Sequence, residues 1–163
     1  MGVYASLKVM DKDAQVLSNI IWVTIGAKFA DSHDKFVKPE DYHTTLLYSR
    51  TGNDKEILPK TRKQYVAKIK DIVNWNSHDL CTVILLDCPE LKSRHKYLMT
   101  KHRLEYDYDD YVPHVTICYD IQVPNSVISK LKKILVDKEL LLSGECIEDL
   151  DEDHTDVTAD NNS

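Results

Sequence analysis

The chain has 163 residues, of which 42% are hydrophobic and 29% are charged, as in an ordinary globular protein. This length suits one well-buried core and is too short for two independent domains, and no run of about 18 apolar residues predicts a membrane span. The formal net charge of −6 is concentrated at one end, because residues 148–163 hold seven acidic side chains and no Lys or Arg, leaving 21 basic and 20 acidic groups elsewhere. A nearly neutral body argues against a long nucleic acid as ligand and is compatible with a small anion held by a few local groups.

The first ten residues have no basic segment followed by an apolar core, so we expect no export and a cytoplasmic location. No Cys-x-x-Cys pair, zinc-type spacing of His and Cys or Gly-rich nucleotide loop occurs, which favours a mechanism without metal or cofactor. We expect buried, reduced thiols at all four cysteines, Cys81, Cys88, Cys118 and Cys146.

The first third of the chain predicts a strand, a helix and a loop. Residues 3–9 alternate apolar and polar side chains, as in a half-buried strand. Asp13 can cap a helix over residues 16–27, although the β-branched run 20–25 also fits a strand. Residues 32–41 are polar and predict a loop.

The remaining elements alternate between strands and helices. Residues 61–73 place apolar side chains on one helical stripe and therefore predict an amphipathic helix. The others are a strand over 42–48, a loop over 49–59, a buried strand over 80–86, a helix over 89–104 with its basic side chains in water, an acidic connection over 106–111, a strand over 113–119, a helix over 125–136 and a strand over 140–150.

Two halves of similar make-up follow from this order. We expect an α+β fold in which two pseudo-symmetric lobes with antiparallel sheets form a central cleft and the helices pack outside. Residues 1–150 would form this domain, and the acidic residues 151–163, which have few apolar side chains, would form a disordered tail.

One polar pattern occurs in both halves, at residues 42–48 and 113–119. Successive side chains of a strand alternate faces, so His43 and Thr45 project from one surface, as do His114 and Thr116. Two imidazoles and two hydroxyls in one pocket suit a phosphodiester that is attacked on one side and protonated on the other. The alternative is that both histidines lie at sheet edges and only bond to threonine.

These motifs resemble the hallmark of the two-histidine phosphoesterases, His-x-Thr/Ser followed by an apolar residue and present twice. Both 43–46 and 114–117 match it at every position. Within that family, the size, the opening residues 1–7 and the acidic end are similar to the bacteriophage anti-CBASS nucleases, which degrade the cyclic oligonucleotide signals of bacterial immunity.

The resemblance implies that His43 and His114 are general acid and base, in an order that the sequence leaves open. One imidazole would remove the proton of a ribose 2′-hydroxyl, which attacks phosphorus, and the other would protonate the leaving 5′-oxygen. The first product would carry a 2′,3′-cyclic phosphate. Thr45 and Thr116 would donate hydrogen bonds to the phosphoryl oxygens.

Four further residues are candidates for binding the substrate. Trp75 stands between two asparagines, where stacking on a base and packing against a neighbour are both open, and the resemblance favours stacking. Tyr4 and Lys8 share the polar face of the first strand and could contact base and phosphate. Glu145 could accept a hydrogen bond from an adenine amino group.

An insertion or deletion could assign this acidic role to Glu148 or Glu139 instead. Trp22, within an apolar run, is expected to lie in the core.

The motifs together with the resemblance imply a monomeric, metal-independent phosphodiesterase that opens cyclic di- and trinucleotides such as 3′,3′-cyclic GMP-AMP in the cytoplasm of the bacterial host. It would bind neither a membrane nor a long nucleic acid. The alternatives are a two-histidine enzyme that processes RNA at 2′,3′-cyclic phosphates or 2′-5′ linkages, and a protein that sequesters a nucleotide without cleaving it.

Overall fold

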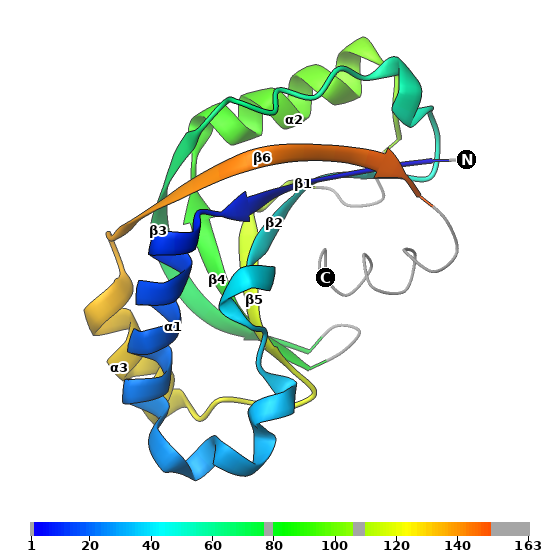
Figure 1. The fold of residues 1–163 in the computed structure, drawn as a ribbon. Coiled ribbons are helices and arrows are strands. Elements are labelled where there is room, and N and C mark those ends of the chain that lie inside the picture. The colour runs from blue at the N-terminus through cyan, green and yellow to red at the C-terminus, as the bar shows by residue number, and fades with distance from the viewer. Residues whose placement is uncertain (1, 77–79, 106–109, 151–163) are drawn as a thin grey trace.

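A computed structural model describes residues 2–76, 80–105 and 110–150 (Figure 1). Their strands are β1 (Val3–Val9), β2 (His43–Ser49), β3 (Tyr65–Trp75), β4 (Cys81–Asp87), β5 (His114–Tyr119) and β6 (Glu139–Asp149), and their α-helices are α1 (Asp11–Ile25), α2 (Pro89–Lys101) and α3 (Asn125–Leu135). Short 3-10 segments span Gly26–Lys35, Pro39–Asp41 and Asp54–Glu56. The predicted tail at 151–163 and most of the predicted connection at 106–111 lie outside the described residues.

All six strands belong to one antiparallel sheet with the order β2-β1-β6-β3-β4-β5. The units β1–α1–β2 and β4–α2–β5 have the same strand, helix, strand order, and β6 and β3 complete the two halves. The α+β class and the two pseudo-symmetric halves are therefore confirmed. This topology puts the two histidine motifs on the two edge strands.

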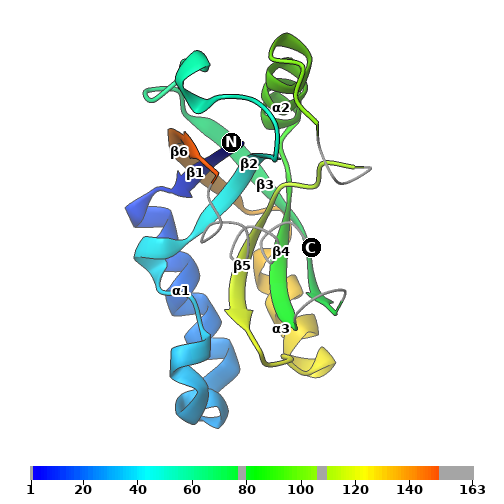
Figure 2. The same cartoon turned by 90° about the vertical axis from the view of Figure 1, so that its right-hand side faces the viewer.

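The sheet divides into two parts, the strands β2-β1-β6 and the strands β3-β4-β5, which we call its wings. β3 and β6 pair only where Tyr65–Lys68 faces Glu139–Leu142, and beyond this stretch the two strands diverge (Figures 1 and 2). The segment before β2 then crosses to β5, where Phe36 forms a bridge with Cys118 and the Val37 amide donates to the Ile117 carbonyl. The two edge strands of one sheet consequently come together.

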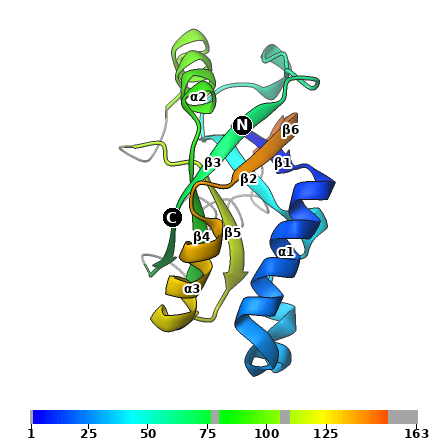
Figure 3. The same cartoon turned by 90° about the vertical axis from the view of Figure 1, so that its left-hand side faces the viewer.

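The helices cover one face of the sheet, and the hydrophobic core lies between the helices and that face. On β1, Val3, Ala5, Leu7 and Val9 are all buried, and the buried stripe of α1 joins the same apolar cluster. α1 and α3 lie side by side on the outside of the sheet (Figures 1 and 3). Burying each such Leu or Ile contributes about 1.5–3 kcal/mol, so this face holds the wings together.

The prediction of a helix over residues 61–73 is wrong, because residues 65–73 belong to β3. Tyr65, Ala67 and Ile69 alternate with exposed residues, but the register shifts between Ile69 and Asp71, and Ile72 becomes the next buried position. One inserted residue thus converts a period of two into a spacing that resembles a helical stripe.

Two smaller expectations also differ from the structure. The first helix begins at Asp11, and Asp13 does not cap it, because its carboxylate accepts a hydrogen bond from the Leu141 amide at 2.8 Å and so ties α1 to β6. Cys146 is exposed, whereas the other three cysteines are buried as expected. Among the described residues, no helix is long and apolar enough to cross a lipid bilayer.

Candidate active site

The strand register places most of the predicted site residues on one face of the sheet, which we call the histidine face. Residues directly opposite each other in neighbouring strands share a face. This face carries Tyr4, Lys8, His43, Thr45, Trp75, His114, Thr116 and Glu148. It is the face turned away from the helices.

The two histidines stand at the first residue of β2 and of β5 and have the same local geometry. The Nδ1 of His43 lies 2.9 Å from the Asp41 carbonyl, and the Nδ1 of His114 lies 2.9 Å from the Val112 carbonyl. A carbonyl oxygen can only accept, so Nδ1–H donates in both cases. Each ring therefore has Nε2 as its nitrogen for exchanging protons with a substrate.

The motifs lie next to each other, although they occupy opposite ends of the strand order. The amide of His114 donates to the hydroxyl of Thr44 at 3.2 Å, which joins the start of β5 to the start of β2. The charge of His43 also acts on the His114 ring. The two imidazoles thus belong to one site.

The motif threonines are both buried but differ in their contacts. The hydroxyls of Thr45 and Tyr4 are 3.3 Å apart. The hydroxyl of Thr116 has no hydrogen-bond partner among the described residues. A buried hydroxyl without a partner costs about 1–3 kcal/mol, so this group is not retained for stability.

Thr116→Val is expected to leave the free energy of unfolding unchanged or to raise it, because Val fills the same space without the unpartnered hydroxyl. Cleavage is expected to slow about 10²- to 10³-fold if this hydroxyl donates to the phosphoryl oxygen. Urea denaturation and steady-state kinetics measure the two effects.

Thr82→Val is the matched control for this substitution. The Thr82 hydroxyl donates to the Asn74 side chain at 2.6 Å, so its loss should destabilise the fold by about 1 kcal/mol and leave the rate intact. Full activity in Thr116→Val would contradict the role of the Thr116 hydroxyl.

Burial makes the two imidazoles unequal. His114 is only 5% exposed, and burial together with the charge of His43 lowers the pKa of His114 to about 4 despite the hydrogen bond to Val112. His43 keeps partial contact with solvent and lines a cavity of about 370 Å³ with Lys38 and Tyr119. His114 is therefore neutral at pH 7 and able to accept a proton.

Trp75 is the last residue of β3. Its ring meets that of His114 edge to face, with centroids 4.6 Å apart. A partly exposed indole beside a candidate base can stack on a nucleobase of a bound ligand.

Tyr4 and Lys8 lie on β1 opposite the first motif. The exposed Lys8 faces His43 in the strand register, within reach of a phosphate bound there. Trp22, which was expected in the core, is partly buried and packs at its edge in an aromatic cluster with His33 and Phe36.

Glu145 lies on the opposite face of β6 and not on the histidine face. Its carboxylate accepts two hydrogen bonds from Arg94, at 2.8 and 3.0 Å, and one from the Lys60 amide at 2.7 Å. Both oxygens are thus already engaged in a buried ion pair. The acidic residue that faces Tyr4 across the strands is Glu148, whereas Glu139 begins β6.

The sequence interpretation missed the role of Arg94, which it placed on the wet side of α2. Arg94 is buried, and Glu145 raises the pKa of the guanidinium by accepting its hydrogen bonds. The signal was present, because Arg94 falls three residues after Leu91 and four before Leu98, on the buried stripe of the helix.

His95, next to Arg94 on α2, contacts the backbone of β2, the strand that carries the first motif. Its Nδ1 lies 2.7 Å from the Leu46 carbonyl, its ring stacks on Tyr111 at 4.1 Å, and the Tyr111 hydroxyl donates to the Thr45 carbonyl at 2.7 Å. α2 thereby fixes the backbone of β2. Across the described part of the chain, no three His, Cys, Asp or Glu side chains are grouped so that they could hold a metal ion.

Two pseudo-symmetric halves, each presenting a His-x-Thr strand to one site, define the class of two-histidine phosphoesterases. The fold is similar to a crystal structure of TT0787 of Thermus thermophilus, with a TM-score of 0.53 at 14% identity over 90% of this chain and 84% of that one.

The chain belongs to the family of the anti-CBASS protein Acb1, whose model matches residues 1–157. It is 34% identical over 115 residues to the Acb1 of Vibrio phage KVP40, covering 69% of this chain and 68% of the relative. It is 33% identical over 126 residues to that of Escherichia phage RB16, covering 75% and 70%. The protein is accordingly a phosphodiesterase that evades CBASS immunity by degrading cyclic nucleotides.

Proposed function

We propose that the protein opens 3′-5′ linkages of cyclic di- and trinucleotides with His114 as general base and His43 as general acid. The observation that carries this proposal is the hydrogen bond from the His114 amide to Thr44, because it brings both motifs to one site. In this proposal the protein acts without a metal, as a monomer, in the cytoplasm of the infected bacterium. Residues 1–150 form one domain, and 151–163 follow as an acidic tail.

The assignment of base and acid rests on burial. His114 has its pKa lowered to about 4, so its Nε2 is unprotonated at pH 7 and can take the proton of the ribose 2′-hydroxyl. His43 keeps contact with solvent, which hydrates its charged form, and it protonates the leaving 5′-oxygen.

The threonines and the remaining residues of the histidine face hold the substrate. Thr45 and Thr116 donate to the two non-bridging oxygens of the phosphate as negative charge develops there. Trp75 stacks on one base, Lys8 binds phosphate and Tyr4 contacts the second base. Glu148 takes the acidic role in base recognition in place of Glu145, because it faces Tyr4.

A cleavage panel in the presence of chelator tests this function. Cyclic GMP-AMP, other cyclic dinucleotides, cyclic trinucleotides and 2′-5′ oligoadenylate are incubated with the wild-type protein and EDTA. We expect the cyclic nucleotides to be opened. Intact recovery of every ligand would indicate sequestration, and cleavage of 2′-5′ oligoadenylate alone would indicate an RNA-processing enzyme.

Stability should depend on pH through His114. The unfolded chain protonates this residue near pH 6.5 and the folded chain near pH 4, so between these values the unfolded state binds more protons. The contribution is fully present above pH 6.5 and is lost as the pH falls to 4, by at most about 3 kcal/mol.

Urea denaturation of wild type and His114→Gln across pH 4 to 7 measures this term. Burial also lowers the pKa of His95, so only the difference between the two proteins isolates His114. The wild type should lose more stability than the variant on acidification. Parallel curves would show that His114 is not buried as a neutral base.

A further inference from the structure

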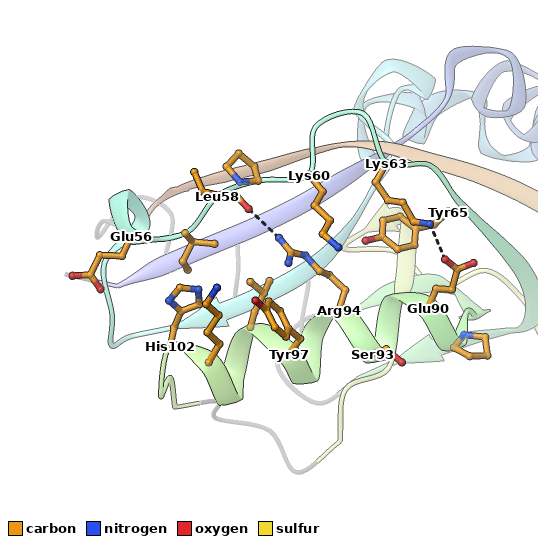
Figure 4. Close-up of a pocket in the computed structure, with 15 residues that line it drawn as sticks. Glu56, Leu58, Lys60, Lys63, Tyr65, Glu90, Ser93, Arg94, Tyr97 and His102 are labelled. Atoms are coloured by element: carbon orange, nitrogen blue, oxygen red, sulfur yellow. Dashed lines mark hydrogen bonds and ion pairs between the residues drawn. The ribbon is translucent and has the colours of Figure 1, made fainter.

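A second cavity lies on the outside of the molecule, between α2 and the segment that leads from residue 56 into β3 (Figure 4). Its volume is about 720 Å³, within the range of small-molecule sites. The lining includes Arg94, whose partner Glu145 points to the face of the sheet opposite the histidines. The cavity is therefore separate from the candidate active site.

Positive charge gathers around Tyr97 in this cavity. Lys63 pairs with Glu90 at 2.9 Å and Arg94 with Glu145 at 2.8 Å. The ammonium groups of the other two lining lysines, Lys60 and Lys101, have no carboxylate partner among the described residues. Glu56, at one end of the lining, has no ion-pair partner among the described residues. The lining therefore carries two lysine ammonium groups and one carboxylate that lack an ion-pair partner there.

This excess of positive charge lowers the pKa of the Tyr97 phenol. Lys101 lies 5.3 Å from the ring centroid and Arg94 lies 5.7 Å from it. The hydrogen bond with Lys101 lowers the pKa of the phenol most, and the charges of Lys101, Arg94 and Lys60 lower it further. An anion bound near this hydroxyl would therefore lie in a region of positive electrostatic potential. In Figure 4, Lys60 extends from the segment before β3 toward Arg94 of α2.

Part of the cavity wall is apolar. Ile57, Leu58, Pro59 and Leu98 line it, and Leu58 is 86% exposed although it is a large hydrophobic residue. The Leu58 carbonyl accepts from Arg94 at 3.1 Å, so the backbone at this rim is held in place while its side chain stands in water. Such a wall suits a planar, weakly polar group that would cover it.

We propose that this outer cavity is a second ligand site, which binds a nucleoside 5′-monophosphate with the phosphate between Lys60 and Lys101 and the base against Leu58 and Pro59. The cavity exceeds the size of a bare phosphate, and its lining combines a cationic end with an apolar wall. A nucleotide combines an anionic phosphate and a planar base in one molecule. The site does not depend on the catalytic assignment of the histidines.

Titration of the isotopically labelled full-length protein with AMP tests the proposal by amide chemical shifts. We expect saturable shifts at residues 57–63 and 93–102, and a dissociation constant at least about tenfold weaker in the double variant K60E/K101E. K130E/K133E, which makes the same charge change on exposed positions of α3, should bind AMP like wild type. All four positions are exposed, so both variants should keep the wild-type spectrum elsewhere.

Three results would overturn the second site. Shifts confined to residues around His43 and His114 would place AMP in the active site. Equal affinity of K60E/K101E and wild type would exclude the cationic end. Inorganic phosphate binding as tightly as AMP would show that the apolar wall contributes nothing and that no nucleotide site exists.

Discussion

Replacing either His43 or His114 with Ala is expected to lower kcat for cleavage of 3′,3′-cyclic GMP-AMP by about 10²- to 10⁴-fold, the usual contribution of a general acid or base. The dissociation constant of the substrate should change little, because Trp75, Lys8 and the threonines remain. Single-turnover cleavage and calorimetric titration separate the two quantities.

His33→Ala is the control for this experiment. His33 stacks on Trp22 at a centroid distance of 4.9 Å, away from both motifs, and its loss should leave kcat unchanged. If His43→Ala or His114→Ala cleaves at nearly the wild-type rate, the two-histidine mechanism is wrong for this protein.

Glu145→Leu is expected to destabilise the fold by about 3–5 kcal/mol, because it leaves the Arg94 guanidinium buried without its partner. Arg94 would retain only the Leu58 carbonyl as acceptor among the described residues. Urea denaturation at pH 7 measures the loss. The double variant R94M/E145L should recover most of it, because no buried charge remains.

The same position tests base recognition. Glu145→Gln keeps the shape of the side chain and still accepts from the Lys60 amide, and we expect KM and kcat of this variant to match wild type. Glu148→Gln, on the histidine face, should raise KM. A raised KM in Glu145→Gln alone would return Glu145 to the substrate site and contradict its structural role.

The sequence identified the two motif strands because both carry their signal within seven residues. His43 with Thr45 and His114 with Thr116 need only strand alternation to share a face. Strand alternation could not predict that the two motifs lie next to each other. That juxtaposition depends on how the sheet divides between β3 and β6 and on the hydrogen bond to Thr44. The resemblance of the motifs to a known family supplied that step.

The failures have local causes. β3 looked helical because an irregularity between Ile69 and Asp71 changes which residues are buried. On β6 a similar irregularity, the register shift between Ser6 and Lys8 of the paired β1, turns the Glu145 side chain to the face opposite the histidines. A single inserted residue reverses the face of every side chain beyond it, and sequence periodicity does not reveal where it falls.

The mass of the first opened product tests the central claim most directly. If the 2′-hydroxyl attacks phosphorus with His114 as base and His43 as acid, cyclic GMP-AMP incubated in ¹⁸O-labelled water yields a linear isomer with a 2′,3′-cyclic phosphate, no ¹⁸O and the mass of the substrate. A first product that is one water heavier and carries the label would show that water, and not the ribose hydroxyl, is the nucleophile.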